Sequence, residues 1–146
     1  MENTQINKEK TKKLKLDFKD SKYSTGRRKK SIAKVWVKKG SGNIHVNGLK
    51  MNEYFKRPVH QIIVTRPLEI SNVASNYDVK CSVKGGGLSG QAGAIILGIP
   101  KALILQDENL KKNLKKDKLT TRDSRVVERK KYGHRKARRS FQFSKR

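Results

Sequence analysis

Acidic residues, cysteine and long apolar runs are all scarce in this sequence of 146 residues. Its 12 Asp and Glu face 37 Lys and Arg, which leaves a net charge of +25. Such an excess repels itself unless a polyanion neutralises it, so the partner should be a nucleic acid or an anionic membrane. The longest apolar run, residues 92–99, falls far short of the roughly 20 residues that span a bilayer. We therefore expect a nucleic-acid partner and no membrane partner.

Cysteine occurs once, as Cys81, and the three histidines are widely spaced. A single cysteine cannot form an intramolecular disulfide, and a zinc cluster needs several Cys or His ligands at close spacing. We therefore expect no metal and no cofactor. Because Cys81 lies on the apolar side of a predicted strand, we interpret it as a buried packing residue rather than a reactive thiol.

The first 22 residues hold seven Lys, four acidic residues and no Arg. A transit peptide is rich in Arg and poor in acids, and a signal peptide needs an apolar core. We therefore expect residues 1–22 to be a polar N-terminal extension, disordered when free. Since one core normally serves about 100 to 150 residues, we place a single globular domain at residues 23–127.

Alternation of apolar and polar residues predicts strands at residues 31–39 and 77–84. Their apolar positions are Ala33, Val35, Val37, Tyr77, Val79, Cys81 and Val83. Residues 43–46 resemble a further short strand, and glycines at 40, 42 and 48 predict that it forms a hairpin with residues 31–39. We interpret Trp36 as a packing residue of its strand, with stacking on a base as the alternative.

Helices are predicted between and after these strands. Residues 50–55 fit one helical turn, residues 60–65 fit either a helix or a strand, and residues 68–74 fit a brief helix after Pro67. An apolar stripe from Ala92 to Leu103 predicts a helix capped by Ser89. Pro100 should kink this helix or end it after Ile99. A surface helix capped by Asp107 should follow and bury only Leu110 and Leu114, so the fold class is α+β.

Residues 85–90, with Gly85, Gly86, Gly87 and Gly90, match the pattern GxGxxG between a predicted strand and a predicted helix. A dinucleotide site also needs a second strand that ends in an acid about 20 residues later, and no such strand is present. The glycines either make a structural turn or offer backbone N–H groups to an RNA phosphate at the helix N-terminus. Both interpretations remain open from the sequence.

Two basic segments are candidates for phosphate contacts. The first is the run Arg27, Arg28, Lys29 and Lys30. The second, residues 128–146, opposes nine Lys and Arg with only Glu128 and adds Tyr132, Phe141 and Phe143. Such a segment cannot collapse on itself, so we expect an extended basic tail whose cations meet phosphates and whose rings pack on bases or sugars.

Several short stretches of this chain, in order and at consistent spacing, resemble the bacterial-type small ribosomal subunit protein nine. The resemblance runs from about Tyr23 to Arg146, and it is carried by residues 25–29 (TGRRK), 84–94 (KGGGLSGQAGA), 121–125 (TRDSR), 128–131 (ERKK) and 141–146 (FQFSKR). The chain departs from many relatives at Ser140-Phe141, where those relatives carry Arg-Pro, and at Pro100 with Ile96-Leu97. These departures affect the path of the tail and the predicted helix.

The resemblance implies a two-layer α/β sandwich like the second domain of small-subunit protein five, with a long basic C-terminal tail. It implies a place in the head of the small subunit, on the 3′ major domain of the rRNA and beside other head proteins. It implies no enzymatic activity. The implied rRNA contacts are Arg27, Arg28, Lys29, Lys30, Arg122, Arg125, Arg129, Lys130, Lys131, Arg135, Lys136, Arg138 and Arg139, with Gly85, Gly86, Gly87 and Gly90 as rRNA backbone contacts or a structural turn.

The resemblance also implies that the tail reaches the tRNA in the P site. Ser144, Lys145 and Arg146 match the residues that approach the anticodon stem-loop. The compartment follows from neither the residues nor the family, since bacterial cytoplasm, mitochondrion and plastid all fit. Two alternatives remain from the residues alone: a free basic protein that compacts nucleic acid, and a nucleotide-dependent enzyme built on the glycine segment.

Overall fold

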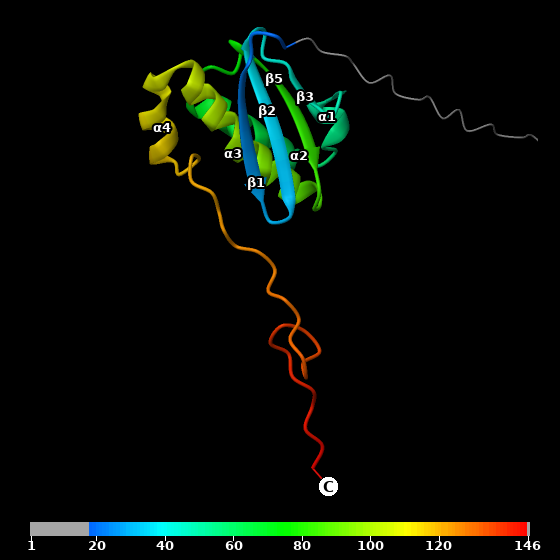
Figure 1. The fold of residues 1–146 in the computed structure, drawn as a ribbon. Helices are drawn as coiled ribbons and strands as arrows, with labels where there is room; N and C mark the ends of the chain where they lie inside the picture. Colours follow the sequence, from blue (N-terminus) through cyan, green and yellow to red (C-terminus); the bar gives the residue numbers. More distant parts are fainter. Residues whose placement is uncertain (1–17, 146) are drawn as a thin grey trace, which may run out of the picture.

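The computed structural model describes residues 18–145, so the predictions for residues 1–17 and for Arg146 lie outside it. Figure 1 shows the elements in chain order. They are β1 (Lys22–Arg28), β2 (Ser31–Lys39), β3 (Ile44–Val46), β4 (Leu49–Lys50), α1 (Met51–Tyr54), α2 (Pro58–Ile70), β5 (Tyr77–Lys84), α3 (Leu88–Gln106), the 3₁₀ turn η1 (Glu108–Leu110) and α4 (Lys111–Lys116).

The strands form one five-stranded sheet in the order β1-β2-β5-β3-β4. β1, β2 and β5 pair antiparallel, whereas β3 runs parallel to β5 and pairs with the short β4. The alternation predicted for β2 and β5 is confirmed, because their apolar positions are buried in the core. Cys81 is among them, and burial raises the pKa of its thiol to about 12, so the thiol stays protonated at neutral pH.

β1 is absent from the sequence-based prediction. Its core-facing positions are Ser24 and Gly26, which carry no apolar pattern. A small residue is required there because a Cβ on Gly26 would lie 1.9 Å from the Ala94 carbonyl oxygen of α3. The Ser24 hydroxyl donates a hydrogen bond of 2.6 Å to the Gly98 carbonyl, also in α3. Because α3 packs so closely on β1, small residues occupy the core-facing positions of this strand. No alternating apolar pattern was therefore present from which to predict it.

The predicted hairpin between residues 31–39 and 43–46 is wrong. β5 lies between β2 and β3, and the tight hairpin is instead β1–β2, joined by Lys29 and Lys30. The loop after β2 is held by Asp78 of β5, which accepts bonds from the Ser41 and Asn43 N–H groups at 3.0 and 2.8 Å. The path of this loop is therefore set by a carboxylate that is far away in the sequence, and not by the residues of the turn itself.

The early helices correct the sequence-based boundaries. The single turn predicted at residues 50–55 is confirmed as α1. The ambiguous residues 60–65 are helical, and the separate helix predicted after Pro67 is wrong, because α2 runs unbroken from Pro58 to Ile70. Val64 and Leu68 are buried on either side of Pro67, so burial of the apolar face offsets the hydrogen bond that proline cannot make.

α3 is the central helix of the core and packs mainly on β1, β2 and α2. Its N-cap is Gly87 without a side-chain cap, so the predicted cap by Ser89 is wrong. The predicted split after Ile99 is also wrong, since the helix continues through Pro100 to Gln106. Ile99 and Leu103 are fully buried, and their packing offsets the roughly 3 kcal/mol that a proline costs inside a helix.

The surface helix predicted after Asp107 consists of η1 followed by α4. Leu114 is buried as predicted and Leu110 is partly buried. Asp107 is the N-cap residue of η1, as predicted, but its carboxylate makes no cap hydrogen bond and instead accepts one from the Tyr77 hydroxyl. Burial, together with this bond, raises the pKa of Tyr77 to about 12.

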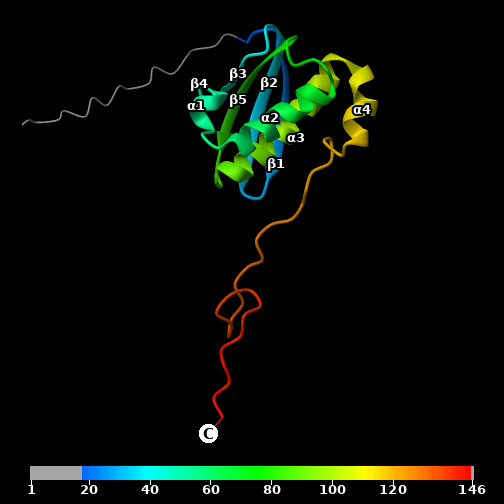
Figure 2. The same ribbon diagram turned by 180° about the vertical axis from the view of Figure 1, so that it is seen from behind.

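The body is a mixed α+β fold in which α2 and α3 cover one face of the sheet, as Figure 2 shows from behind. Ten buried residues of α3 lie in this layer. By length and composition alone α3 could also cross a membrane, but its apolar residues are accounted for by packing on the sheet. The predicted similarity to small-subunit protein five remains an expectation.

Candidate nucleic-acid interface

The four basic residues from Arg27 to Lys30 end β1 and turn into β2, and the structure gives them different surroundings. Lys29 and Lys30 are exposed at the turn, and Lys29 has a left-handed φ of +51°. Arg27 lies on the side of β1 away from the helices and is exposed. Arg28 faces α3, and its side chain is only 21% exposed. The sequence run therefore divides into three solvent-facing cations and one structural arginine.

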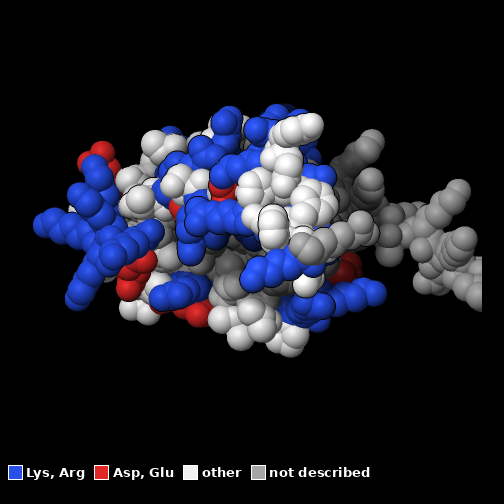
Figure 3. Space-filling view, turned by 90° about the horizontal axis from the view of Figure 1, so that it is seen from below, with Lys and Arg blue, Asp and Glu red and all other residues white. Residues whose placement is uncertain are grey.

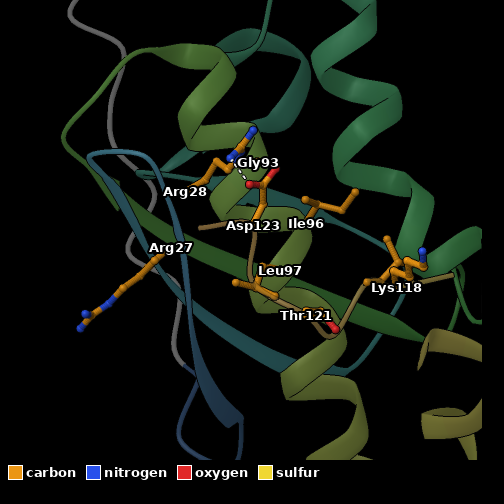
Figure 4. Close-up of a pocket in the computed structure, with 9 residues that line it drawn as sticks. Arg27, Arg28, Gly93, Ile96, Leu97, Lys118, Thr121 and Asp123 are labelled. Atoms are coloured by element: carbon orange, nitrogen blue, oxygen red, sulfur yellow. Dashed lines mark ion pairs between the residues drawn. The ribbon is translucent and has the colours of Figure 1, made fainter. Parts of the chain in front are cut away.

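Arg28 fastens the beginning of the C-terminal segment to the body. Its Nη1 lies 2.9 Å from Oδ1 of Asp123 and donates a hydrogen bond of 3.2 Å to the Arg125 carbonyl. Figure 4 shows Arg28 directed at Asp123, while Arg27 points away. Arg27, Arg28 and Asp123 line a pocket of about 210 Å³ together with Gly93 of α3. We call the Arg28–Asp123–Arg125 cluster the tail clasp.

Asp123 is the acidic centre of the tail clasp. The Arg125 side chain bonds to both of its oxygens at 2.8–3.2 Å, and the Arg125 backbone N–H donates a further bond of 2.9 Å. These bonds to Arg125, with the nearby Arg28 charge, hold the pKa of the Asp123 carboxyl far below its usual range. The carboxylate therefore remains charged at any pH at which the protein meets RNA.

The glycine segment after β5 has a structural reason at most of its positions. Gly85 and Gly86 have φ of +76° and +59°, and a Cβ there would lie 2.5 Å from the Lys30 carbonyl oxygen and 2.2 Å from the Ser31 hydroxyl. A Cβ on Gly90 would also approach that hydroxyl, at 2.8 Å. At Gly87 a Cβ would meet nothing within 4 Å. The turn interpretation thus explains three of these glycines, and Gly87 has no steric reason of its own.

The basic turn at Lys29 and Lys30 and the glycine segment meet in one groove of about 890 Å³. We call it the glycine groove; its lining residues are Lys29, Lys30, Ser31, Arg57, His60, Gly86, Gly87, Leu88, Ser89, Gly90, Val126 and Val127. The N-terminus of α3 opens into it without a side-chain cap, which leaves backbone N–H groups for an anion. Three cations and a helix N-terminus around one groove suit an RNA phosphate.

Arg57 and His60 of this groove were missed by sequence reasoning. His60 is buried; its Nε2 lies 3.0 Å from the Ser89 hydroxyl, and its Nδ1 has no hydrogen-bond partner among the described residues. No sequence pattern linked Arg57 or His60 to the glycine segment, because only folding brings the N-termini of α2 and α3 together. No strand follows α3 within residues 18–145, so the second strand of the dinucleotide-binding pattern is not among the elements of this part of the chain.

The C-terminal segment carries most of the other predicted contacts and lies away from the body in Figures 1 and 2. All of its basic residues within residues 128–145 are exposed, as is Arg122 just before the tail clasp. They are Arg129, Lys130, Lys131, Arg135, Lys136, Arg138, Arg139 and Lys145. Seen from below in Figure 3, Lys and Arg side chains dominate this end of the molecule and acidic ones are few.

Within this segment, residues 134–140 form a small loop that the sequence did not predict. His134 and Ser140 make an isolated β-bridge, and the Arg135 guanidinium lies 5.3 Å from the centroid of the Phe141 ring. Glu128 pairs with Lys131 at 2.7 Å and with Arg138 at 2.9 Å, which lowers the pKa of its carboxyl. Ser144 and Lys145 follow as exposed residues at the end of the described chain.

A comparison with known families shows the class of protein. Among residues 18–145, no group of three or more His, Cys, Asp or Glu side chains is placed to hold a metal ion. The model of the family described as ribosomal protein S9/S16 matches residues 26–146, from the middle of β1 to the end of the C-terminal segment. The chain belongs to the ribosomal protein S9/S16 family, and it is therefore a structural, non-enzymatic protein of the ribosome that binds rRNA.

Proposed function

We propose that this protein is built into the head of the small ribosomal subunit, on the 3′ major domain of the rRNA. Its C-terminal segment then extends through RNA to the tRNA in the P site. The observation that carries the proposal is the continuous, exposed and strongly basic segment after the tail clasp, whose ending FQFSKR carries the family resemblance. Neighbouring head proteins are the expected protein partners.

The body supplies the anchor. Lys29, Lys30 and Arg57 around the glycine groove provide cations beside the uncapped N-terminus of α3. Phosphate contacts of this kind release condensed counterions and set the position of the protein without reading a base sequence. The groove therefore favours binding to the shape of a folded rRNA backbone. Because Gly87 has no side chain and open space beside it, the rRNA backbone can approach the protein backbone closely there.

The tail clasp gives the segment a defined starting point. Arg28 holds Asp123 and the Arg125 carbonyl against the body, so the chain leaves at a fixed place beside α3. The loop at residues 134–140 shortens the segment, but its contacts are exposed. RNA phosphates compete with Glu128 for Lys131 and Arg138, and we expect the loop to open on rRNA and to lengthen the reach of the segment.

Deleting Lys145 and Arg146 tests the tail assignment. Their removal should leave folding and subunit assembly intact, because Lys145 is exposed and makes no contact with the body's core. Binding of tRNA to the P site of purified subunits should weaken several-fold, with less accurate start-site choice. A matched control replaces the exposed Lys115 and Lys116 of α4 by Gln, which removes two positive charges from the body instead of the tail.

Four outcomes of this and two related measurements distinguish the proposal from its alternatives. Weaker tRNA binding in the truncated chain but not in the α4 control supports the tail assignment, whereas unchanged tRNA binding by both contradicts it. A chain that stays off small subunits at moderate salt would instead favour a free nucleic-acid-compacting protein. Saturable nucleotide binding to the RNA-free protein, lost in Gly87→Ala, would favour the nucleotide-dependent alternative.

A further inference from the structure

The sheet has a second face, turned away from α2 and α3. Within residues 18–145, the outward side chains of β1, β2 and β5 lie on this face with no helix packed over them (Figure 1). The strand register arranges them in the rows Tyr23-Trp36-Lys80, Thr25-Lys34-Ser82 and Arg27-Ile32-Lys84. We call this surface the open sheet face. Of its residues, Arg27 is among the predicted rRNA contacts, and Trp36 has base stacking as the alternative to its predicted packing role.

Two aromatic rings form one end of the open sheet face. The Tyr23 and Trp36 ring centroids lie 5.3 Å apart with the planes tilted by 42°, and Tyr23 is 44% exposed. The Lys80 ammonium lies 5.8 Å from the Trp36 ring centroid and 5.7 Å from that of Phe18. An exposed tyrosine ring and a half-buried tryptophan ring beside an ammonium group suit a nucleotide, since a base packs on a ring while its phosphate meets a cation.

Cations form the other end. Arg27, Lys34 and Lys84 are exposed, and the two lysines flank a shallow pocket of about 180 Å³ with Ile32 and Ser82. The acid of this face, Asp78, is bound by the N–H groups of the loop after β2. Although burial alone would raise the pKa of Asp78, these bonds lower it. The carboxylate is therefore charged, and its charge is used in hydrogen bonds to the loop. The face therefore presents a net positive charge to its partner.

We infer that the open sheet face binds an unpaired rRNA segment, with a base on Tyr23 and Trp36 and adjacent phosphates on Lys34 and Lys84. This inference rests on the proposed rRNA-binding function and adds a second binding surface, on the opposite side of the sheet from α3. Bases inside a duplex are already stacked on each other, so the rings select a loop, bulge or single strand. An acidic protein segment would satisfy the lysines but leave the rings without a planar partner.

Trp36 reports on this contact directly because it is the one tryptophan of the chain. The full-length protein is titrated with a transcript of the 3′ major domain at moderate salt, while mobility shift measures binding and fluorescence measures the environment of Trp36. Stacking of a base should quench the emission in parallel with binding. Polyglutamate, a polyanion without bases, serves as the second titrant and should bind without this quenching.

Variants separate stacking from charge. Trp36→Ala should weaken RNA binding by at least about fivefold, the lower end of a base–ring stack, and Trp36→Phe should restore most of the affinity. Because Trp36 is half-buried, Lys34→Gln/Lys84→Gln is the variant that does not disturb packing. It should lower the salt slope of log K by about 1.4 for two single-strand phosphate contacts. Lys112→Gln/Lys115→Gln on α4 is the control of equal charge.

The outcomes distinguish this inference from the proposed function. RNA binding with unchanged Trp36 emission, or equal losses in the sheet and α4 double variants, would overturn the open sheet face as a site and leave the rRNA-binding function standing. Quenching by polyglutamate equal to that by RNA would also overturn it, in favour of a purely ionic or protein contact. Absence of any RNA binding by the full chain would defeat both.

Discussion

Neighbouring residues of the same type have different tasks in this protein. Arg27 and Arg28 are adjacent in sequence and alternate in direction because they lie on a strand. Arg27 therefore joins the open sheet face, whereas Arg28 holds Asp123 in the tail clasp. The sequence gives the number of charges in this run. The alternation of side chains along the strand decides which of these charges are exposed and can contact RNA.

The tail clasp provides a prediction at this scale. Arg28→Gln should free the backbone at residues 122–127, while Arg27→Gln, with the same loss of charge, should leave it ordered. Backbone NMR order parameters of these residues should fall from about 0.85 toward 0.6 or less in the first variant only. Equal order in both variants would mean that the clasp does not set the path of the segment.

The same clasp has a defined pH dependence. The pKa of Asp123 is held below its usual range, so the interaction is complete above the ordinary carboxyl pKa and is lost only as the pH falls through the lowered value. The order of residues 122–127 should therefore be unchanged down to about pH 4. Asp123→Asn should lack the clasp at every pH.

At the scale of elements, β1 approaches α3 so closely that a Cβ on Gly26 would overlap the helix backbone. Gly26 and Gly98 face each other, and a Cβ on Gly26 would also lie 2.7 Å from the Gly98 backbone nitrogen. Backbone atoms on both sides cannot move aside as a flexible side chain would. The small residues of β1 and α3 therefore fix how closely the edge strand packs on the central helix.

Substitution at two glycines tests this packing. Gly26→Ala should lower the free energy of unfolding by about 2–3 kcal/mol, because the added methyl group forces β1 away from α3. Gly87→Ala should change it by less than about 1 kcal/mol, since its φ of −109° and the open space accept a Cβ and the reduced entropy of the unfolded chain offsets the poorer N-cap. Urea denaturation of both variants gives the two values.

Gly87→Ala also bears on the glycine groove. If RNA backbone approaches the N-terminus of α3, the variant should bind rRNA more weakly than the native chain while remaining nearly as stable. Comparable losses of stability in the two glycine variants would contradict the close-packing account of β1 and α3.

At the scale of the whole molecule, charge governs both stability and binding, with opposite dependence on salt. The net charge of +25 destabilises the compact protein by self-repulsion, which salt screens. The urea midpoint of the RNA-free protein should therefore rise as KCl increases. Over the range from about 50 to 200 mM, affinity for rRNA should fall by roughly a thousandfold or more, for about six phosphate contacts.

The comparison is made on one preparation, by denaturation without RNA and by equilibrium binding with it. The thermal midpoint of the complex should fall over the same salt range, because bound RNA stabilises the folded state in proportion to its affinity. Rising stability in both the free and the bound protein would show that the contacts are not dominated by phosphates.

The parts of the fold that were predictable are those where one residue pattern has one physical cause. Alternation in β2 and β5 follows from a sheet with one buried face, and the stripe of α3 follows from a helix with one buried side. β1 and the β2–β3 connection were not predictable in this way. Ser24 and Gly26 of β1 are set by the approach of α3, and the loop after β2 is set by Asp78.

The sequence by itself determined that this protein binds a polyanion and belongs to a ribosomal family, because net charge and ordered motifs do not depend on how the chain folds. Only the tertiary structure decided which groups act together. Strand pairing separates Arg27 from Arg28, folding brings Lys29 and Lys30 to the N-terminus of α3, and strand register places Tyr23 beside Trp36. The last two arrangements join residues that are far apart in the sequence, so no local sequence pattern could predict them.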